Sequence, residues 1–230
     1  MPVDAQEPEP ARPELRSTLM EMETLRLKTD SPGSAEFAAG LVLMGRVVAL
    51  PTDTVYGVAA HGLVPGAVRS LYAIKERPTS LPIPLLLPDA DAMARVCVDI
   101  PAVAWELARG FWPGGLSLVL RRAHDVPDEV TSGGDTVAVR VPDHALVRHL
   151  CRLVGAPLAV TSANRHGEPA PVTADEVWNQ LNGRVPLLLD GGECSSGRAS
   201  TVLDLTVRPP VIRREGPVSS RQLEGLVATG

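Results

Sequence analysis

The sequence predicts an α/β protein whose twisted sheet mixes parallel and antiparallel strands and is flanked by helices. Apolar segments of strand length alternate irregularly with segments of helical spacing, and hairpin-like stretches lie among them. That irregularity favours a mixed sheet over a strictly repeating βαβ unit. At 230 residues, with 44% hydrophobic and 21% charged residues, the chain can bury the core of one such domain.

Turn and capping residues mark the ends of the predicted elements. Gly45 stops the first helix, and Pro78 disfavours helical geometry at Arg77, so the second helix is expected to end near Lys75 or Glu76. Helices are expected over Ala35–Met44, Gly66–Lys75, Ala102–Gly110, His144–Leu153, Ala174–Leu181 and Ser219–Val227. Strands are expected over Thr24–Lys28, Arg46–Leu50, Pro84–Leu87, Leu116–Arg121, Thr136–Val141, Leu158–Val160, Leu187–Leu189, Thr201–Leu205 and Pro210–Arg213.

The N-terminal segment differs in composition from the rest of the chain. Residues 1–23 are rich in Pro, Glu and Arg and poor in apolar side chains, so they cannot bury enough surface to offset the entropy of ordering. We predict a flexible tail over residues 1–23 and one folded domain over residues 24–230.

Charge and cysteine content limit the function classes. A net charge of −5 does not favour polyanion binding by the whole surface, so any anion site is expected to be local. No stretch approaches about 20 uninterrupted apolar residues and no secretory signal is present, so no membrane partner is expected. Three widely spaced cysteines fit neither a disulfide framework nor a paired metal site. The expected location is the reducing cytoplasm.

The stretch Val47–Arg77 begins with an apolar strand and continues into a polar turn. Pro51 ends regular pairing, the side chains of Thr52 to Thr54 supply oxygen atoms, and Gly57 permits a backbone angle that other residues avoid. Such a loop at the end of a buried strand is typical of a ligand site.

Two cationic residues lie where the following helix is expected to end. Lys75 and Arg77 are expected to point the same way if the segment before Pro78 is extended. A compact ammonium and a planar guanidinium together suit a triphosphate. A solvated helix end is the alternative interpretation of the same residues.

Further polar residues follow other strands. Thr161–Asn164 comes after an apolar run and could bind a nucleotide or act as a helix N-cap. The loop Gly191–Thr201 could wrap an anion with backbone amides or serve as a connector, and its spacing excludes a P-loop. Arg140 and Arg214 could face a cavity or lie on the surface. Because ligands gather beyond the carboxyl ends of strands, one shared cavity is expected.

In combination, these segments resemble the YrdC-like family of threonylcarbamoyl-AMP synthases over about Leu25–Leu226. The motifs that carry the resemblance are, in order, PTDTVYG, the KxR signature at Lys75–Arg77, FWPGGLSLVL, VAVRVP, TSAN with the SxN signature, LLDGG, and AST followed by VLDL. Two stretches depart from the family pattern, Pro78–Leu85 and Arg213–Gly216. The second departure makes the match of Arg214 approximate. The chain resembles the short, single-domain form.

The resemblance implies a YrdC-like fold with a large concave ligand cavity and a nucleotidyltransferase activity. L-threonine and bicarbonate would form a carbamate that attacks the α-phosphate of ATP, giving threonylcarbamoyl-adenylate and pyrophosphate. This would be the first step of threonylcarbamoyladenosine modification of tRNA. By motif match, Lys75 and Arg77 would be catalytic. Thr54 and Arg77 would bind threonine and bicarbonate. The nucleotide would contact Lys75, Arg140, Ser162, Asn164, Ser200 and Arg214.

The resemblance also bears on cofactors and partners. Mg²⁺ would be held mainly by the phosphates of ATP, with no protein metal site. A separate threonylcarbamoyl transferase would act downstream, and tRNA binding would not be required for this step. Two alternatives are a noncatalytic relative that binds nucleotide or RNA, and a carbamoyl-adenylate step in metalloenzyme maturation. The retained Lys75, Arg77, Ser162 and Asn164 favour the enzyme.

Overall fold

The structure is a computed structural model that describes residues 23–227. The predicted tail falls almost entirely outside these residues and remains a prediction. The helices are α1 (Ser34–Leu43), α2 (Pro65–Lys75), α3 (Met93–Val96), α4 (Ala102–Phe111), α5 (Asp128–Thr131), α6 (Ala145–Val154), α7 (Ala174–Leu181) and α8 (Ser220–Val227). The strands are β1 (Leu25–Lys28), β2 (Val48–Leu50), β3 (Gly57–His61), β4 (Leu85–Leu86), β5 (Cys97–Val98), β6 (Leu116–Arg122), β7 (Thr136–Arg140), β8 (Leu158–Ser162), β9 (Leu187–Asp190), β10 (Thr201–Asp204) and β11 (Val211–Arg214).

The strands form one mixed sheet in the order β1-β9-β2-β3-β8-β4-β7-β6-β10-β11, with β5 beside β6. The pairs β1–β9, β2–β9, β4–β7 and β6–β10 are parallel, and the remaining pairs are antiparallel. The predicted fold class is therefore confirmed. Among the described residues, no helix is of a length and apolarity that would let it cross a bilayer.

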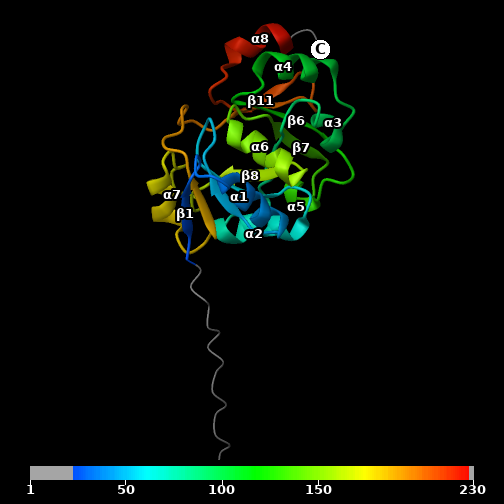
Figure 1. The fold of residues 1–230 in the computed structure, drawn as a ribbon. Helices are drawn as coiled ribbons and strands as arrows, with labels where there is room; N and C mark the ends of the chain where they lie inside the picture. Colours follow the sequence, from blue (N-terminus) through cyan, green and yellow to red (C-terminus); the bar gives the residue numbers. More distant parts are fainter. Residues whose placement is uncertain (1–22, 228–230) are drawn as a thin grey trace, which may run out of the picture.

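The two faces of the sheet are buried in different ways. On one face, Leu85, Leu118 and Val139 are register neighbours in the larger apolar core, which α2, α4, α7 and α8 complete. On the other face, α1 and α6 lie side by side (Figure 1) and pack on β2, β3, β8 and β9. Over β6, β7 and β10, the second face instead borders a cavity.

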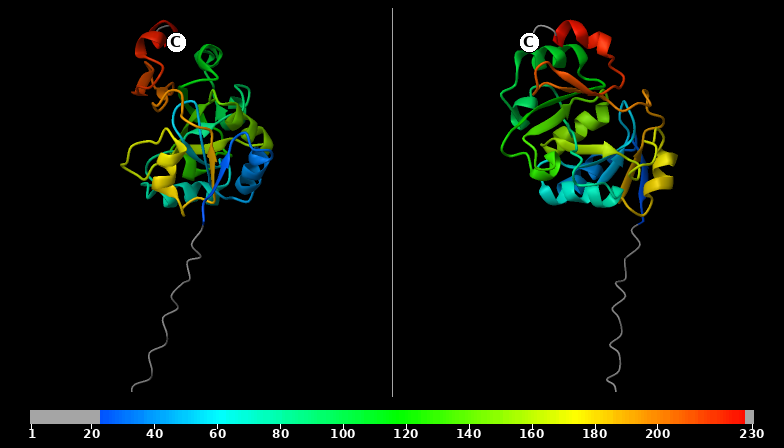
Figure 2. Two further views of the ribbon diagram at one scale, coloured as in Figure 1. Left: turned by 60° about the vertical axis from the view of Figure 1, so that its left-hand side comes forward. Right: turned by 180° about the vertical axis from the view of Figure 1, so that it is seen from behind.

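The C-terminal elements complete the cavity end of the sheet. Figure 2 shows β10, β11 and α8 gathered at the end of the molecule opposite the start of β1. The antiparallel pair β10–β11 extends the sheet beyond β6, so residues after position 200 can reach the same face as β7. This is how the last part of the chain contributes to a cavity that begins with the loop after β2.

Sequence patterns missed four short or atypical elements. The strand β3, where only Gly57 had been placed, at the end of the predicted turn, consists of Gly57-Val58-Ala59-Ala60-His61 and lies between β2 and β8. Glycine and alanine are poor strand formers, so burial between two strands decides its conformation. The other three elements, α3, α5 and β5, have two to four residues, too few for a periodic pattern.

Candidate active site

A cavity of about 460 Å³ lies on the open part of the second sheet face. Its floor is apolar and comes from alternating strand positions, including Val119 on β6, Ala138 on β7, Val160 on β8 and Val202 on β10. All four polar segments singled out in the sequence contribute to its wall: Thr52, Thr54 and Gly57; Arg77; Thr161 and Ser162; and Ala199 and Ser200. The fold thus brings together polar groups that are far apart along the chain.

The loop after β2 is held by its own threonines. The Thr52 hydroxyl donates to the carbonyl of Val55 at 2.7 Å and accepts from the backbone N–H groups of Thr54 and Val55 at 3.1 and 3.3 Å. The hydroxyl oxygens of Thr52 and Thr54 are 2.9 Å apart. Local side-chain hydrogen bonds therefore hold the loop in this conformation, in which Thr54 lines the cavity.

Arg140, at the end of β7, is buried rather than at the surface, with 5% of its area exposed. Its Nε donates to the carbonyl of Gly114 at 2.8 Å, its Nη1 donates to the Thr54 hydroxyl at 3.1 Å, and its Nη2 forms an ion pair with Asp53. Burial lowers the pKa of Arg140, and the Asp53 carboxylate opposes that shift. Asp53 therefore offsets the positive charge of Arg140.

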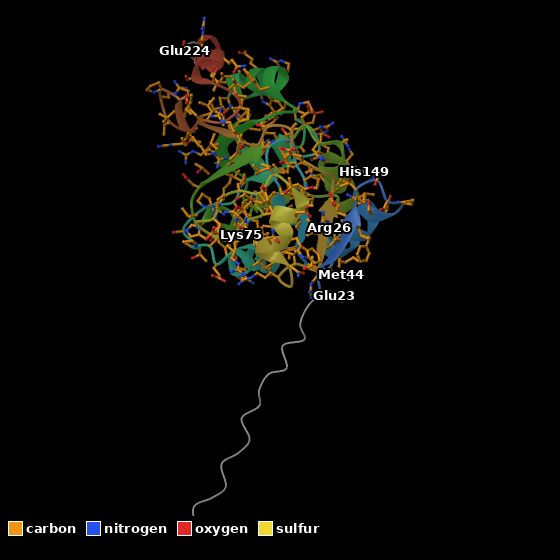
Figure 3. All side chains as sticks on the ribbon, turned by 90° about the vertical axis from the view of Figure 1, so that its left-hand side faces the viewer. Glu23, Arg26, Met44, Lys75, His149 and Glu224 are labelled. Atoms are coloured by element: carbon orange, nitrogen blue, oxygen red, sulfur yellow. The ribbon has the colours of Figure 1, made fainter. Side chains whose placement is uncertain are left out.

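Lys75 is the last residue of α2 and is buried, with 1% of its area exposed. Figure 3 labels it within the body of the molecule, in contrast to Met44 and Glu224 at the surface. Its Nζ donates to the carbonyl of Ser162, to the Ser162 hydroxyl at 3.3 Å and to Asn164 Oδ1 at 3.1 Å. Burial lowers the pKa of Lys75 to about 7, with a smaller contribution from the charge of Arg77.

The segment between Lys75 and Arg77 was expected to be extended, but the structure shows that it is not. Glu76 adopts a left-handed conformation, with φ 55°, and caps α2. The chain therefore turns sharply between Lys75 and Arg77, so the two side chains reach different places. Arg77 lines the cavity, whereas Lys75 lies behind Ser162 and does not line it.

Asn164 organises the loop behind the cavity. Its Nδ2 donates to the carbonyls of Arg165 and Glu168 at 2.8 and 2.7 Å, while its Oδ1 accepts from Lys75 and from the Ser162 hydroxyl. Asn164 does not line the cavity, but Ser162 does. No helix follows this segment directly, so the N-cap interpretation is wrong.

Two arginines face the cavity with no carboxylate partner among residues 23–227. Arg77 donates to the carbonyls of Leu81 and Pro82 at 3.4 and 3.2 Å. Arg214 donates to the carbonyl and hydroxyl of Ser200 at 2.9 and 3.1 Å. Burial lowers the pKa of both, and the charges of Arg140 and Arg77 lower that of Arg214 further. Guanidinium groups remain charged, so this end of the cavity is positive.

A neutralised pair, Asp204 and Arg213, also lines the cavity. Asp204 accepts from Thr206 through Oδ1 and from Arg213 through Oδ2, the latter at 3.1 and 2.9 Å. Both oxygen atoms of the carboxylate are therefore occupied. Among the described residues, no group of three or more His, Cys, Asp or Glu side chains could hold a metal ion.

Six of the eight predicted site residues line the cavity: Thr54, Arg77, Arg140, Ser162, Ser200 and Arg214. Sequence reasoning missed the partner of Arg140, because Asp53 lies 87 positions away. It also missed Ser117, whose hydroxyl lies 2.9 Å from that of Ser200. A polar residue within the apolar strand segment Leu116–Leu120 was the available signal for Ser117.

Comparison with known proteins extends these observations. The family model Sua5_yciO_yrdC, described as telomere recombination, matches residues 41–216. A threonylcarbamoyl-AMP synthase from Pyrococcus abyssi is 40% identical over 190 residues, covering 83% of this chain and 56% of the relative. The corresponding protein of Bacillus subtilis is 38% identical over 205 residues, covering 89% and 59%. The chain thus spans somewhat more than half the length of these curated relatives.

Solved structures resemble the fold closely. The crystal structure of P. abyssi Sua5 complexed with L-threonine is 37% identical, with a TM-score of 0.84 over 89% of this chain and 60% of that chain. Escherichia coli YciO, at 23% identity and a TM-score of 0.76 over 87% of this chain and 97% of that chain, shares the fold.

Proposed function

The chain belongs to the Sua5, YciO and YrdC family, and on that premise we propose that it makes threonylcarbamoyl-adenylate and pyrophosphate from L-threonine, bicarbonate and ATP. The names of the P. abyssi and B. subtilis relatives support this reaction, and the L-threonine complex of P. abyssi Sua5 supports the amino acid. The product would serve the first step of threonylcarbamoyladenosine modification of tRNA.

The observation that carries the proposal is the pair of guanidinium groups without a carboxylate partner. Arg77 and Arg214 face a cavity that also presents three hydroxyl side chains, those of Thr54, Ser162 and Ser200. Two uncompensated cations at one cavity attract a polyanion even though the whole chain is acidic. We propose that they hold the phosphates of ATP, with Ser200 placed by its hydrogen bond to Arg214.

The proposed chemistry needs charge stabilisation more than a protein nucleophile. The amine of threonine attacks bicarbonate, water leaves, and a carbamate oxygen of the product attacks the α-phosphate as pyrophosphate departs. Arg77 would offset the negative charge that gathers when these anions meet. Lys75 would add positive potential from behind Ser162, at the end of the same network. Cys194 is no candidate nucleophile, because burial raises the pKa of its thiol.

Mg²⁺ enters the proposal as an ion carried by the nucleotide. Both Asp204 oxygens are occupied, and Asp53 is paired with Arg140, so these described carboxylates do not fit an all-protein site. When bound to the phosphates, the ion would neutralise part of their charge. We assign no step to it.

The proposal extends to partners and location. A separate transferase would carry the labile adenylate product to tRNA, and direct tRNA binding would not be needed for the step described. The proposal places the enzyme in the cytoplasm, where Cys97, Cys151 and Cys194, which are free and buried, would remain reduced.

Pyrophosphate release tests the function directly. We expect release from ATP to require both L-threonine and bicarbonate, and mass spectrometry of the same reaction to detect threonylcarbamoyl-adenylate. Omitting either co-substrate is the control. ATP binding without the double requirement would reject the synthase and support a noncatalytic nucleotide-binding protein.

A further inference from the structure

A second cavity, of about 280 Å³, shares no lining residue with the candidate active site. It is formed by the loop after β4, by α3 and by the C-terminal end of α6. Ligand sites for drug-sized molecules usually enclose about 300 to 1,000 Å³, so the second cavity suits a smaller molecule.

The floor of the second cavity is apolar and held in place. Its side chains include Leu87, Val96 and Cys151, all of which are buried. The thiol of Cys151 donates to the carbonyl of Leu86 at 3.5 Å, and the N–H of Leu87 donates to the carbonyl of Arg140 at 2.8 Å. The floor is therefore preformed, and it offers contact to an apolar group.

Two guanidinium groups line the same cavity at its exposed rim. Arg95 on α3 donates to the carbonyl of Gly155 at 3.4 Å, and Arg152 on α6 donates to the carbonyl of Pro88 at 3.2 Å. Each guanidinium has five N–H donors, and these are its hydrogen bonds within residues 23–227. Most of the donors of both arginines are therefore open to a ligand.

A carboxylate lines the cavity as well, but it does not neutralise these cations. In the described part of the chain, Asp89 forms no ion pair with Arg95 or Arg152. Its Oδ1 accepts from the N–H of Ala92 at 3.1 Å, and its Oδ2 has no donor among the described residues. Groups of both signs thus face one cavity without meeting each other.

The end of α6 adds negative potential to the cavity. Gly155, with φ 70°, caps this helix through hydrogen bonds from its N–H to the carbonyls of Cys151 and Arg152 at 3.0 and 3.2 Å. Gly155 also lines the cavity. The C-terminal end of a helix carries a partial negative charge, so it favours a cation. Asp89 and this helix end together favour a positive group on the ligand, whereas the two arginines favour a negative one.

We propose that the second cavity binds a free α-amino acid with a small apolar side chain. The α-carboxylate pairs with Arg95 and Arg152, the ammonium pairs with Asp89, and the side chain rests on the apolar floor. Asp89 would repel a dianion such as a phosphate ester. Because the charged groups are exposed, the expected affinity is weak, in the millimolar range. The inference concerns a different cavity from the proposed synthase site and does not depend on it.

Titration of the full chain with L-valine, followed by ¹H–¹⁵N NMR, tests both the binding and its place. We expect saturable shifts of the amide signals of Ala92 and Gly155, which line the second cavity. Two analogues of valine separate the charges: 3-methylbutanoate lacks the amine, and 2-methylpropylamine lacks the carboxylate. Each analogue loses one ion pair, so each should bind about fivefold or more weakly than L-valine.

Variants of the charged residues assign the two ends of the ligand. Arg95→Gln and Arg152→Gln should each weaken the binding of L-valine about fivefold or more. Asp89→Asn keeps an oxygen for the N–H of Ala92 and removes the charge, so it should weaken L-valine but not 3-methylbutanoate. Arg109→Gln, at an exposed position of α4 that lines neither cavity, is the matched control and should bind like the wild type.

Three results would overturn the inference. The first is the absence of a saturable shift at Gly155. The second is a set of shifts confined to Thr54 and Ser162, which would place L-valine in the first cavity. The third is equal affinity for L-valine and 3-methylbutanoate in the wild type, which would show a site for simple carboxylates in which Asp89 has no part.

Discussion

The buried ammonium of Lys75 leads to a stability prediction with a definite sign. Burial lowers its pKa from 10.5 to about 7, so between these values the unfolded chain binds a proton that the folded protein releases. Stability therefore rises with pH in this window. Lys75→Met keeps the length of the side chain and removes the titration, so it provides the reference.

The magnitude follows from the linkage relation. One pKa unit is worth about 1.4 kcal/mol, and the folded protein is about half protonated at pH 7 and nearly neutral at Lys75 by pH 9. Integrated over these two pH units, the wild type should gain about 2 kcal/mol of unfolding free energy relative to Lys75→Met. Groups other than Lys75 cancel in the difference.

Urea denaturation of both proteins at pH 7, 8 and 9 measures this difference. Lys75→Met should also lose most of its synthase activity, because Ser162 and Asn164 lose a shared donor. A stability difference that changes by less than about 0.5 kcal/mol between pH 7 and pH 9 would refute the argument from burial. A change of the opposite sign would mean that the folded state binds the proton more tightly.

Three further predictions concern the cavity, the loop beside it and the core. Arg77→Ala and Arg214→Ala should each lower kcat/KM for ATP by about a hundredfold or more in the pyrophosphate assay, with circular dichroism spectra like that of the wild type; near-normal turnover would remove them from the phosphate site. Tyr56→Phe removes hydrogen bonds of 2.7 and 3.1 Å to Gly192 and Gly191, so trypsin should cut after Arg198 faster than in the wild type, and an equal rate would show that the tyrosine does not hold this loop. Leu118→Ala, at a position with 0% exposure, should cost about 2–5 kcal/mol of unfolding free energy in urea, and a cost below 1 kcal/mol would contradict its place in the core.

Local patterns predicted most of the secondary structure. The helix Gly66–Lys75 was predicted to end near Lys75, and α2 ends there, because Glu76 adopts the left-handed conformation of a helix cap. The strand β3 was missed, since its glycine and alanines have no strand preference of their own. Its conformation depends on β2 and β8, which lie on either side of it.

The candidate site, like the secondary structure, was predictable from the sequence only in part. Thr54, Arg77, Ser162 and Ser200 lie in polar segments that were predicted at strand and helix ends, whereas their individual assignment as site residues came from the family motifs. The structure places all four on one cavity. The different environments of Lys75 and Arg77 were not predictable, because alternation along an extended chain does not apply across the left-handed Glu76. The burial of Arg140 likewise depends on a strand pairing that a single sequence does not display.

The sequence by itself determined the fold class and the set of polar segments, because both depend on the spacing and chemistry of residues close together in the chain. Only the tertiary structure decided which cations remain uncompensated. Asp53 neutralises Arg140 from 87 positions away, and Lys75 meets Asn164 from 89 positions away. Such pairs form only when separate strands place their ends together, and they leave Arg77 and Arg214 as the cations that face the cavity without a carboxylate partner in the described part of the chain.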